Sequence, residues 1–290
     1  MDTTIKHLVI SGGGPLLLNM YGALKQSNIL EMWSHTNVES FHGTSAGAML
    51  STFMSLKYDW DELDNYIINR PWHNILNFNV LNIYDYYSNN GIMDKKFIYE
   101  MFSPLFKAKD IDLDIDIETF CQITGVSLYL YATEYSTFDV KEFSAEATPR
   151  VKILDAVYAS MAIPILFKPI VIEDKLYLDG SILINYPMTK CLERNEDSKT
   201  ILGIRHELAT KVIKTDNSTE FDMLHYASNT IHKIINKMQI EPTDANIKEI
   251  IVHAKIEDMA NFFKLANSSE DRKRVIECGI QDAINYLQPN

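Results

Sequence analysis

The sequence contains little cysteine, and its three cysteines form no recognisable pattern. Cys121, Cys191 and Cys278 are odd in number and far apart in a chain of 290 residues. Such a set argues against a disulfide framework, and no two of them have the short spacing that zinc sites use. We therefore expect a protein of a reducing compartment, with no metal site and no cofactor.

Long hydrophobic runs are missing as well. No stretch of about 18 uncharged apolar residues occurs, so no segment is expected to span a bilayer. The N-terminal residues MDTTIKHLVISGGG lack the apolar core of a signal peptide. These absences predict a cytoplasmic protein, and any membrane contact is expected to be peripheral.

Positive charge is scarce in this chain. It has 27 Lys and Arg residues against 39 Asp and Glu residues, which gives a formal net charge of -12. Nucleic acid binding needs clustered basic residues, so the balance argues against a nucleic acid partner. The same deficit weakens attraction to anionic membranes. A membrane contact should therefore be apolar in character.

The N-terminal quarter has the pattern of an open α/β fold. Hydrophobic residues make up 46% of the chain, enough for a large core. The pattern predicts strand 5–11, helix 16–30, strand 38–42 and helix 46–56. A strand-helix-strand-helix order implies a parallel sheet with helices on its faces.

Later segments continue the α/β pattern, and no shift in composition marks a domain boundary. Residues 59–106 are expected to be mostly helical, with irregular breaks. Further strands are expected at 126–133, 171–173, 175–178, 200–204 and 249–254, and helices at 153–161, 221–238 and 276–287. We therefore expect a single domain.

The strongest local motif is Gly43-Thr44-Ser45-Ala46-Gly47. It matches G-x-S-x-G between an expected strand and an expected helix, where a sharp turn exposes a serine hydroxyl. The helix dipole at that point favours negative charge near the hydroxyl. Ser45 is therefore a candidate nucleophile, and an ordinary strand-to-helix turn is the alternative.

Three consecutive glycines, Gly12, Gly13 and Gly14, follow the first expected strand. Uncovered backbone N–H groups at the start of a helix form an anion site. A dinucleotide fingerprint needs a third glycine where Leu17 stands, and the Gly-Lys-Ser/Thr ending of a P-loop is absent. An oxyanion hole for acyl transfer and a plain tight turn are the interpretations that remain.

A third candidate is Asp179, which follows the apolar residues 176–178 and precedes Gly180. A carboxylate at a strand end beside glycine can approach another loop closely. An ordinary Asp-Gly turn is the alternative for this motif alone.

Together these motifs resemble the patatin-like phospholipase family. A fourth matching stretch, Ala159-Ser160-Met161-Ala162-Ile163-Pro164, precedes the aspartate, and the order fits across about residues 5–205. The resemblance implies a three-layer α/β/α sandwich with a mainly parallel sheet, on which residues 206–290 pack. It also implies metal-independent hydrolysis of lipid acyl esters through an acyl-enzyme.

By the same resemblance, each motif residue has an expected role. Ser45 is the nucleophile and Asp179 the base, while the N–H groups of residues 12–14 form the oxyanion hole. The flanking glycines at positions 43, 47 and 180 support the motifs. The expected lipid substrate is a phospholipid or another acyl ester.

The sequence departs from the family pattern at three positions. Leu16 and Leu17 stand where the family usually has Arg or Lys and then Gly, and Ser181 stands where it has Gly or Ala. The missing cation could change which head group is accepted. Backbone N–H donors should survive, because they do not depend on side chains.

Two other functions remain as alternatives. A Ser-His-Asp triad could use His253, which follows the apolar residues 250–252; His206, His225 and His232 are less suitable candidates. A lipid-binding protein without turnover could use the same fold.

An acidic run occupies residues 110–118, where Asp and Glu alternate with Ile and Leu. The run lacks the glycine and the twelfth-position acid of an EF-hand loop in any one register. We therefore expect the exposed face of a strand there, and no calcium site.

Overall fold

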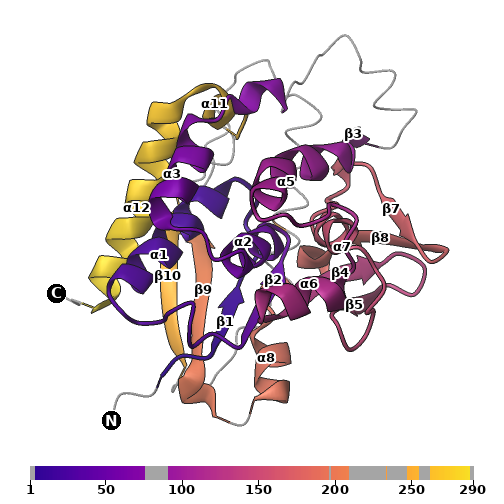
Figure 1. The fold of residues 1–290 in the computed structure, drawn as a ribbon, viewed down its shortest axis with the longest axis horizontal. Helices are drawn as coiled ribbons and strands as arrows, with labels where there is room; N and C mark the ends of the chain where they lie inside the picture. Colours follow the sequence, from indigo (N-terminus) through magenta and orange to yellow (C-terminus); the bar gives the residue numbers. More distant parts are fainter. Residues whose placement is uncertain are drawn as a thin grey trace.

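Figure 1 shows the computed structural model of the chain. The structure describes residues 4–75, 91–195, 197–208, 233, 247–254 and 262–287.

An eight-stranded sheet forms the centre of the molecule, in the order β10-β9-β1-β2-β4-β8-β7, with β5 also paired to β4. The five strands from β10 to β4 are parallel, while β5, β7 and β8 join by antiparallel pairing. The strands are β1 His7–Ile10, β2 Ser40–Thr44, β4 Ser127–Glu134, β5 Asp139–Phe143, β7 Ile170–Ile172, β8 Lys175–Asp179, β9 Ile201–Leu208 and β10 Lys248–Ala254. A separate two-stranded sheet pairs β3 Gly91–Met93 with β6 Ile165–Phe167.

Helices cover both faces of the large sheet. Their bounds are α1 Leu17–Ile29, α2 Ala46–Ser55, α3 Trp60–Asn69, α5 Lys96–Ala108, α6 Ile117–Thr124, α7 Ile153–Ser160, α8 Met188–Arg194, α11 Phe262–Asn267 and α12 Ser269–Leu287. Short 3₁₀ helices are η1 Gly14–Leu16, η2 Trp72–Asn74, η4 Gly180–Ile182 and η5 Ser198–Thr200. None of the helices in the described ranges is long and apolar enough to cross a bilayer.

The alternation of side chains along β1 explains the layers. Leu8 and Ile10 are fully buried in the large core beneath α1, α2 and α12. Val9 points to the opposite face, where it packs with Met188 and Cys191 of α8. Figure 1 shows α12 beside α1 along the β9–β10 edge, and α5, α6 and α7 over the half that contains β4 and β8. This arrangement confirms the expected α/β/α sandwich.

Most of the predicted elements are present, with small shifts at their ends. The first strand and both early helices lie within their predicted ranges, while β2 begins two residues later than expected. The predicted hairpin is confirmed as β7 and β8, joined by Glu173 and Asp174. Both turn residues have positive φ, 49° and 61°, as a two-residue hairpin turn requires.

The prediction of a strand in the acidic run is wrong. Residues 110–115 form turns and irregular chain, Asp116 makes one isolated bridge to Lys152, and α6 begins at Ile117. Asp116 caps α6 by accepting a hydrogen bond from the Thr119 N–H at 2.8 Å. The residues alternate because Ile111 and Ile117 are buried, and Leu113 and Ile115 partly buried, against the core even though this segment is irregular.

Two further differences concern regions outside the parallel strands. The sequence patterns missed β5 and the small β3–β6 sheet, whose strands are short or carry several charged residues. The helix predicted at 221–238 lies outside the described residues, apart from residue 233.

Candidate active site

Ser45 lies at the sharp turn between β2 and α2. Its backbone angles are φ 54° and ψ −118°, a conformation that side chains other than glycine rarely adopt. Residues 43–47 are all buried, and Ser45 is only 7% exposed. Surrounding packing holds the strained turn, as in the nucleophile elbow that the motif predicted.

The two glycines of the motif allow this turn because each lies against backbone atoms. A Cβ at Gly47 would lie 2.1 Å from the carbonyl oxygen of Ile10 on β1. A Cβ at Gly43 would lie 2.4 Å from the carbonyl oxygen of Gly47. Any larger residue at either position would push α2 away from the sheet.

Sheet pairing brings Asp179 to Ser45 across 134 residues of sequence. On β4, Tyr131 pairs with Thr44 of β2, and the next residue, Ala132, pairs with Asp179 of β8. The Ser45 Oγ donates a hydrogen bond to Asp179 Oδ2 at 2.8 Å. The two side chains therefore meet at the carboxyl end of the parallel strands, where open α/β sheets bind ligands.

Asp179 is 2% exposed and is held from both sides. Its Oδ1 accepts the Ser181 N–H at 2.7 Å, while the Thr133 hydroxyl donates to its carbonyl oxygen at 3.0 Å. Burial raises the pKa of Asp179 to about 6, although hydrogen bonds from Ser181 and Ser45 act in the opposite direction. The carboxylate is thus a stronger base than an exposed aspartate and remains ionised at neutral pH.

Gly180 and Ser181 form the start of η4, directly after the aspartate. A Cβ at Gly180 would lie 2.1 Å from the carbonyl oxygen of Tyr131, so only glycine allows this approach of β8 to β4. Ser181 lies against the glycine loop, since a Cβ at Gly12 would be 2.3 Å from its Oγ.

The glycine loop lies beside Ser45, but its three N–H groups are not equivalent. A Cβ at Gly12 would lie 3.2 Å from Ser45 Cβ. The Gly12 N–H donates to the carbonyl oxygen of Asn185 at 2.8 Å, so it is already engaged. The N–H groups of Gly13 and Gly14 donate to no group in the described parts of the chain. These two amides are therefore the ones open to an anion.

Leu16, which replaces the cation of the family pattern, is fully buried beneath the loop. It packs in the core and contributes no charge to the surface. Another polar group approaches the loop instead: His206 Nδ1 lies 3.4 Å from Ser11 Oγ, and it would be 3.3 Å from a Cβ at Gly13.

Ser160 is a site residue for which the sequence supplied no role. Its Oγ accepts the Ser45 N–H at 2.9 Å and donates to the carbonyl oxygen of Tyr131 at 2.5 Å. Both groups are buried, and the bond joins residues 115 positions apart. Its place in the A-S-x-x-x-P stretch was the available signal, but only the fold shows what the hydroxyl contacts.

The histidine considered for a triad lies elsewhere. His253 is on the edge strand β10, three strands from β2, or about 14 Å at the usual strand spacing. Its side chain is 68% exposed, and Nδ1 lies 3.3 Å from Asp282 Oδ1. His225 and His232 lie outside the described residues. Within the described ranges, no three His, Cys, Asp or Glu side chains form a group suited to a metal ion.

The comparison with protein families agrees with this geometry. The family described as Patatin-like phospholipase matches residues 8–192, which include the glycine loop, the elbow and Asp179. The chain belongs to the patatin-like phospholipase family.

Two viral proteins are similar in sequence to this family member. It is 27% identical over 185 residues to the "Probable lipid hydrolase 463L" of Invertebrate iridescent virus 6, and 26% identical over 190 residues to the "Uncharacterized protein R571" of Acanthamoeba polyphaga mimivirus. The alignments cover 63% and 65% of this chain, and 62% of each relative's length.

The fold is similar to the crystal structure of VipD from Legionella pneumophila. The TM-score is 0.53 at 14% identity, covering 95% of this chain and 67% of VipD. At this identity the likeness concerns the fold alone.

Proposed function

We propose that this protein hydrolyses acyl esters of lipids, with Ser45 as nucleophile and Asp179 as general base. The observation that carries the proposal is the 2.8 Å hydrogen bond from Ser45 Oγ to Asp179 Oδ2, made by a serine on a strained elbow and a buried carboxylate. Family membership supports the substrate class, as does the name of the iridescent virus relative.

In the first half of the reaction, Asp179 takes the proton of the Ser45 hydroxyl while Oγ attacks the ester carbonyl. The carbonyl oxygen becomes an oxyanion, which the N–H groups of Gly13 and Gly14 stabilise. When this intermediate collapses, the proton on Asp179 passes to the leaving alcohol. The acyl group remains on Ser45 as an ester.

In the second half, water replaces the alcohol. Asp179 removes a proton from the water, which attacks the acyl-enzyme and forms a second oxyanion at the same amides. Collapse returns the proton to Ser45 Oγ and releases the fatty acid. Each proton that Asp179 takes is given back, so the dyad ends the cycle unchanged.

We propose two oxyanion donors in place of the three that the resemblance implied. The motif predicted the amides of all three loop glycines, whereas the Gly12 N–H is bound to the Asn185 carbonyl. We therefore assign the role to Gly13 and Gly14. The Gly12 bond holds the loop against the segment that follows Asp179.

The first test is labelling by a fluorophosphonate probe, together with turnover of a short soluble ester. We expect labelling of the natural protein and none of Ser45→Ala, with turnover lower by at least about 10³-fold in Ser45→Ala and Asp179→Asn. His253→Ala is the control for a triad, and it should keep full activity. Labelling that persists in Ser45→Ala would exclude Ser45 as the nucleophile.

A lipid panel then defines the substrate class. Phospholipids, lysophospholipids and neutral glycerides are offered to the natural protein and to Ser45→Ala, with and without EDTA. Turnover that EDTA leaves unchanged and that the substitution removes is expected. Lipid binding without turnover of any ester would favour the non-catalytic alternative.

A further inference from the structure

Apolar side chains are exposed on two neighbouring β-hairpins. The described residues include nine exposed large hydrophobic side chains, and four of these lie on the β4–β5 and β7–β8 hairpins. Their exposed fractions are 58% for Tyr135, 51% for Phe138, 38% for Val140 and 62% for Val171. We call these four residues the apolar patch.

Strand register places Tyr135, Val140 and Val171 on one face, and Phe138 lies in the adjoining turn between β4 and β5. Val140 and Leu178 both pair with Thr133 of β4, and Val171 pairs with Leu176, two residues before Leu178. Paired residues of antiparallel strands point to the same face, as do residues two apart. The Tyr135 N–H bonds to the Leu176 carbonyl at 2.8 Å, so Tyr135 continues this face.

The patch lies at the active-site end of the sheet. Tyr135 is three residues beyond Ala132, the residue that pairs with Asp179, which corresponds to about 10 Å along the strand. The β4–β5 and β7–β8 turns both lie beyond this level, and Figure 1 shows β7 and β8 at the margin of the molecule. A surface in contact with the patch would therefore be close to the Ser45–Asp179 pair.

Phe138 is held in an unfavourable backbone conformation. Its φ is +57°, in the left-handed region that suits glycine or asparagine and that bulky residues rarely adopt. The strain costs about 1 kcal/mol and leaves a phenyl ring half in water. Neither term favours folding, so the stability of the fold does not account for a phenylalanine at this position.

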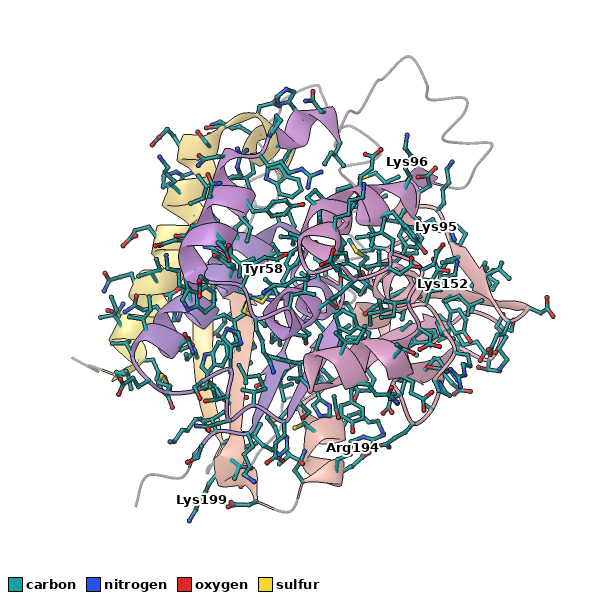
Figure 2. All side chains as sticks on the ribbon, in the orientation of Figure 1. Tyr58, Lys95, Lys96, Lys152, Arg194 and Lys199 are labelled. Carbon is teal, nitrogen blue, oxygen red and sulfur yellow. The ribbon has the colours of Figure 1, made fainter. Side chains whose placement is uncertain are left out.

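The charges around the patch nearly cancel. Residues 134–141 and 168–175 carry four carboxylates and three ammonium groups, and Lys175 is paired with Glu134 at 2.8 Å. Figure 2 labels Lys95 and Lys152 on the same side of the molecule, and both are paired, with Asp155 at 3.2 Å and Asp114 at 2.7 Å. An anionic surface would find no excess of cations here.

We propose that the apolar patch inserts into an electrically neutral lipid surface, such as phosphatidylcholine, and brings the active site to its substrate. This inference rests on the proposed function, because the lipid surface is the source of the acyl ester. Tyrosine and phenylalanine suit the boundary between head groups and acyl chains. The chain's net charge of -12 disfavours docking through anionic head groups.

The test measures binding to phosphatidylcholine vesicles by flotation, in a Ser45→Ala background so that the lipid is not consumed. The variant Phe138→Asn/Val171→Thr should bind at least about tenfold more weakly, because it lacks two apolar side chains that the lipid would bury. Asparagine tolerates positive φ and threonine keeps β-branching, so the melting temperature should not fall.

Ile123 provides a matched control. Its side chain is 58% exposed, like that of Tyr135, but it lies on α6 before β4, at the opposite end of that strand. Ile123→Ser should bind vesicles like the parent. The inference is overturned if the parent does not bind phosphatidylcholine, if Ile123→Ser loses as much binding as the double variant, or if binding requires phosphatidylserine.

A soluble ester separates this inference from the proposed function. With Ser45 intact, Phe138→Asn/Val171→Thr should hydrolyse a monomeric short-chain ester at the normal rate and a vesicle substrate at least about tenfold more slowly. Equal rates on vesicles would overturn the inference and leave the proposed function standing. Vesicle binding that depends on the patch, in a protein that cleaves no ester, would support the surface and overturn the proposed hydrolysis.

Discussion

The two turns that form the site are built in opposite ways. The elbow, residues 43–47, is buried throughout and lies against backbone atoms of β1 and of its own helix. The glycine loop, residues 12–14, becomes more open along its length, and a Cβ at Gly14 would meet no atom within 4 Å. The difference fits the roles proposed for the two turns: the proposed nucleophile needs packing that holds its strained turn, whereas the amides proposed to receive an oxyanion must stay unbonded until substrate arrives.

The largest expected effect comes from replacing Asp179, the carboxylate that Ser45 of the buried elbow contacts. Asp179→Asn should lower turnover by about 10³-fold and yet raise stability at pH 8 by about 3 kcal/mol. The pKa of Asp179 is raised from 3.8 to about 6, so the folded chain binds this proton more tightly than the unfolded chain. The free energy of unfolding of the natural protein therefore rises as the pH falls from about 6 to 4. Above pH 6 the ionised Asp179 destabilises the fold.

Denaturant unfolding of the natural protein and of Asp179→Asn, at pH 8 and at pH 4, tests the direction of this pH dependence. The advantage of Asp179→Asn should shrink at pH 4, where the natural aspartate is largely protonated. A variant less stable than the natural protein at pH 8 would contradict the burial argument.

The second prediction tests the two turns directly with the same substitution. Gly47→Ala should cost at least about 3 kcal/mol, because its Cβ would lie 2.1 Å from the Ile10 carbonyl oxygen. In Gly14→Ala the new Cβ would lie in open space, so only the strain of φ +51° should lower stability, by about 1 kcal/mol. Urea unfolding measures the free energy of unfolding of both variants. Equal losses of stability would contradict the distinction between the two turns.

The third prediction concerns pH. Activity on a soluble ester should be half-maximal near pH 6 and fall about tenfold per unit below it, because protonated Asp179 cannot accept the Ser45 proton. The labelling rate by the fluorophosphonate probe should follow the same curve. A midpoint near pH 4 would show that the carboxylate is hydrated in solution.

The smallest effect is expected from Ser160, which holds the elbow through a single hydroxyl. Ser160→Ala leaves the buried Ser45 N–H without its acceptor, so kcat should fall about tenfold and stability by about 1–3 kcal/mol, with KM unchanged. The labelling rate of Ser45 should fall with kcat, which lower stability alone would not cause.

Ser51→Ala is the matched control for that substitution. Ser51 is fully buried in α2, and its Oγ has no hydrogen-bond partner in the described parts of the chain. Removing this hydroxyl should leave both kcat and stability unchanged or slightly improved. Similar losses in Ser51→Ala and Ser160→Ala would remove the positioning role of Ser160.

The success of the sequence patterns differed between the two halves of the sheet. The parallel half was predictable, because β1, HLVI, is a short apolar strand followed by the glycine loop. β2, SFHGT, is more polar, but it leads directly into the G-x-S-x-G motif. The antiparallel half was only partly predictable. β5 reads DVKEF, with three charged residues, and it forms because β4 offers it a free edge. In the acidic run, residues 110–118, the error was the reverse: a strand was predicted and none formed. Alternating burial occurred there without strand pairing.

By itself, the sequence determined the local parts of the site: a serine on a strand-to-helix turn, a run of glycines before a helix, and an aspartate at a strand end. These depend on residues within a few positions of one another. Tertiary structure alone decided that Gly12 is engaged by Asn185, that Ser160 holds the Ser45 N–H, and that Asp179 is buried enough to raise its pKa to about 6. Those properties arise from contacts between residues 115 and 173 positions apart in the sequence, or from burial by the whole fold. No local pattern encodes them.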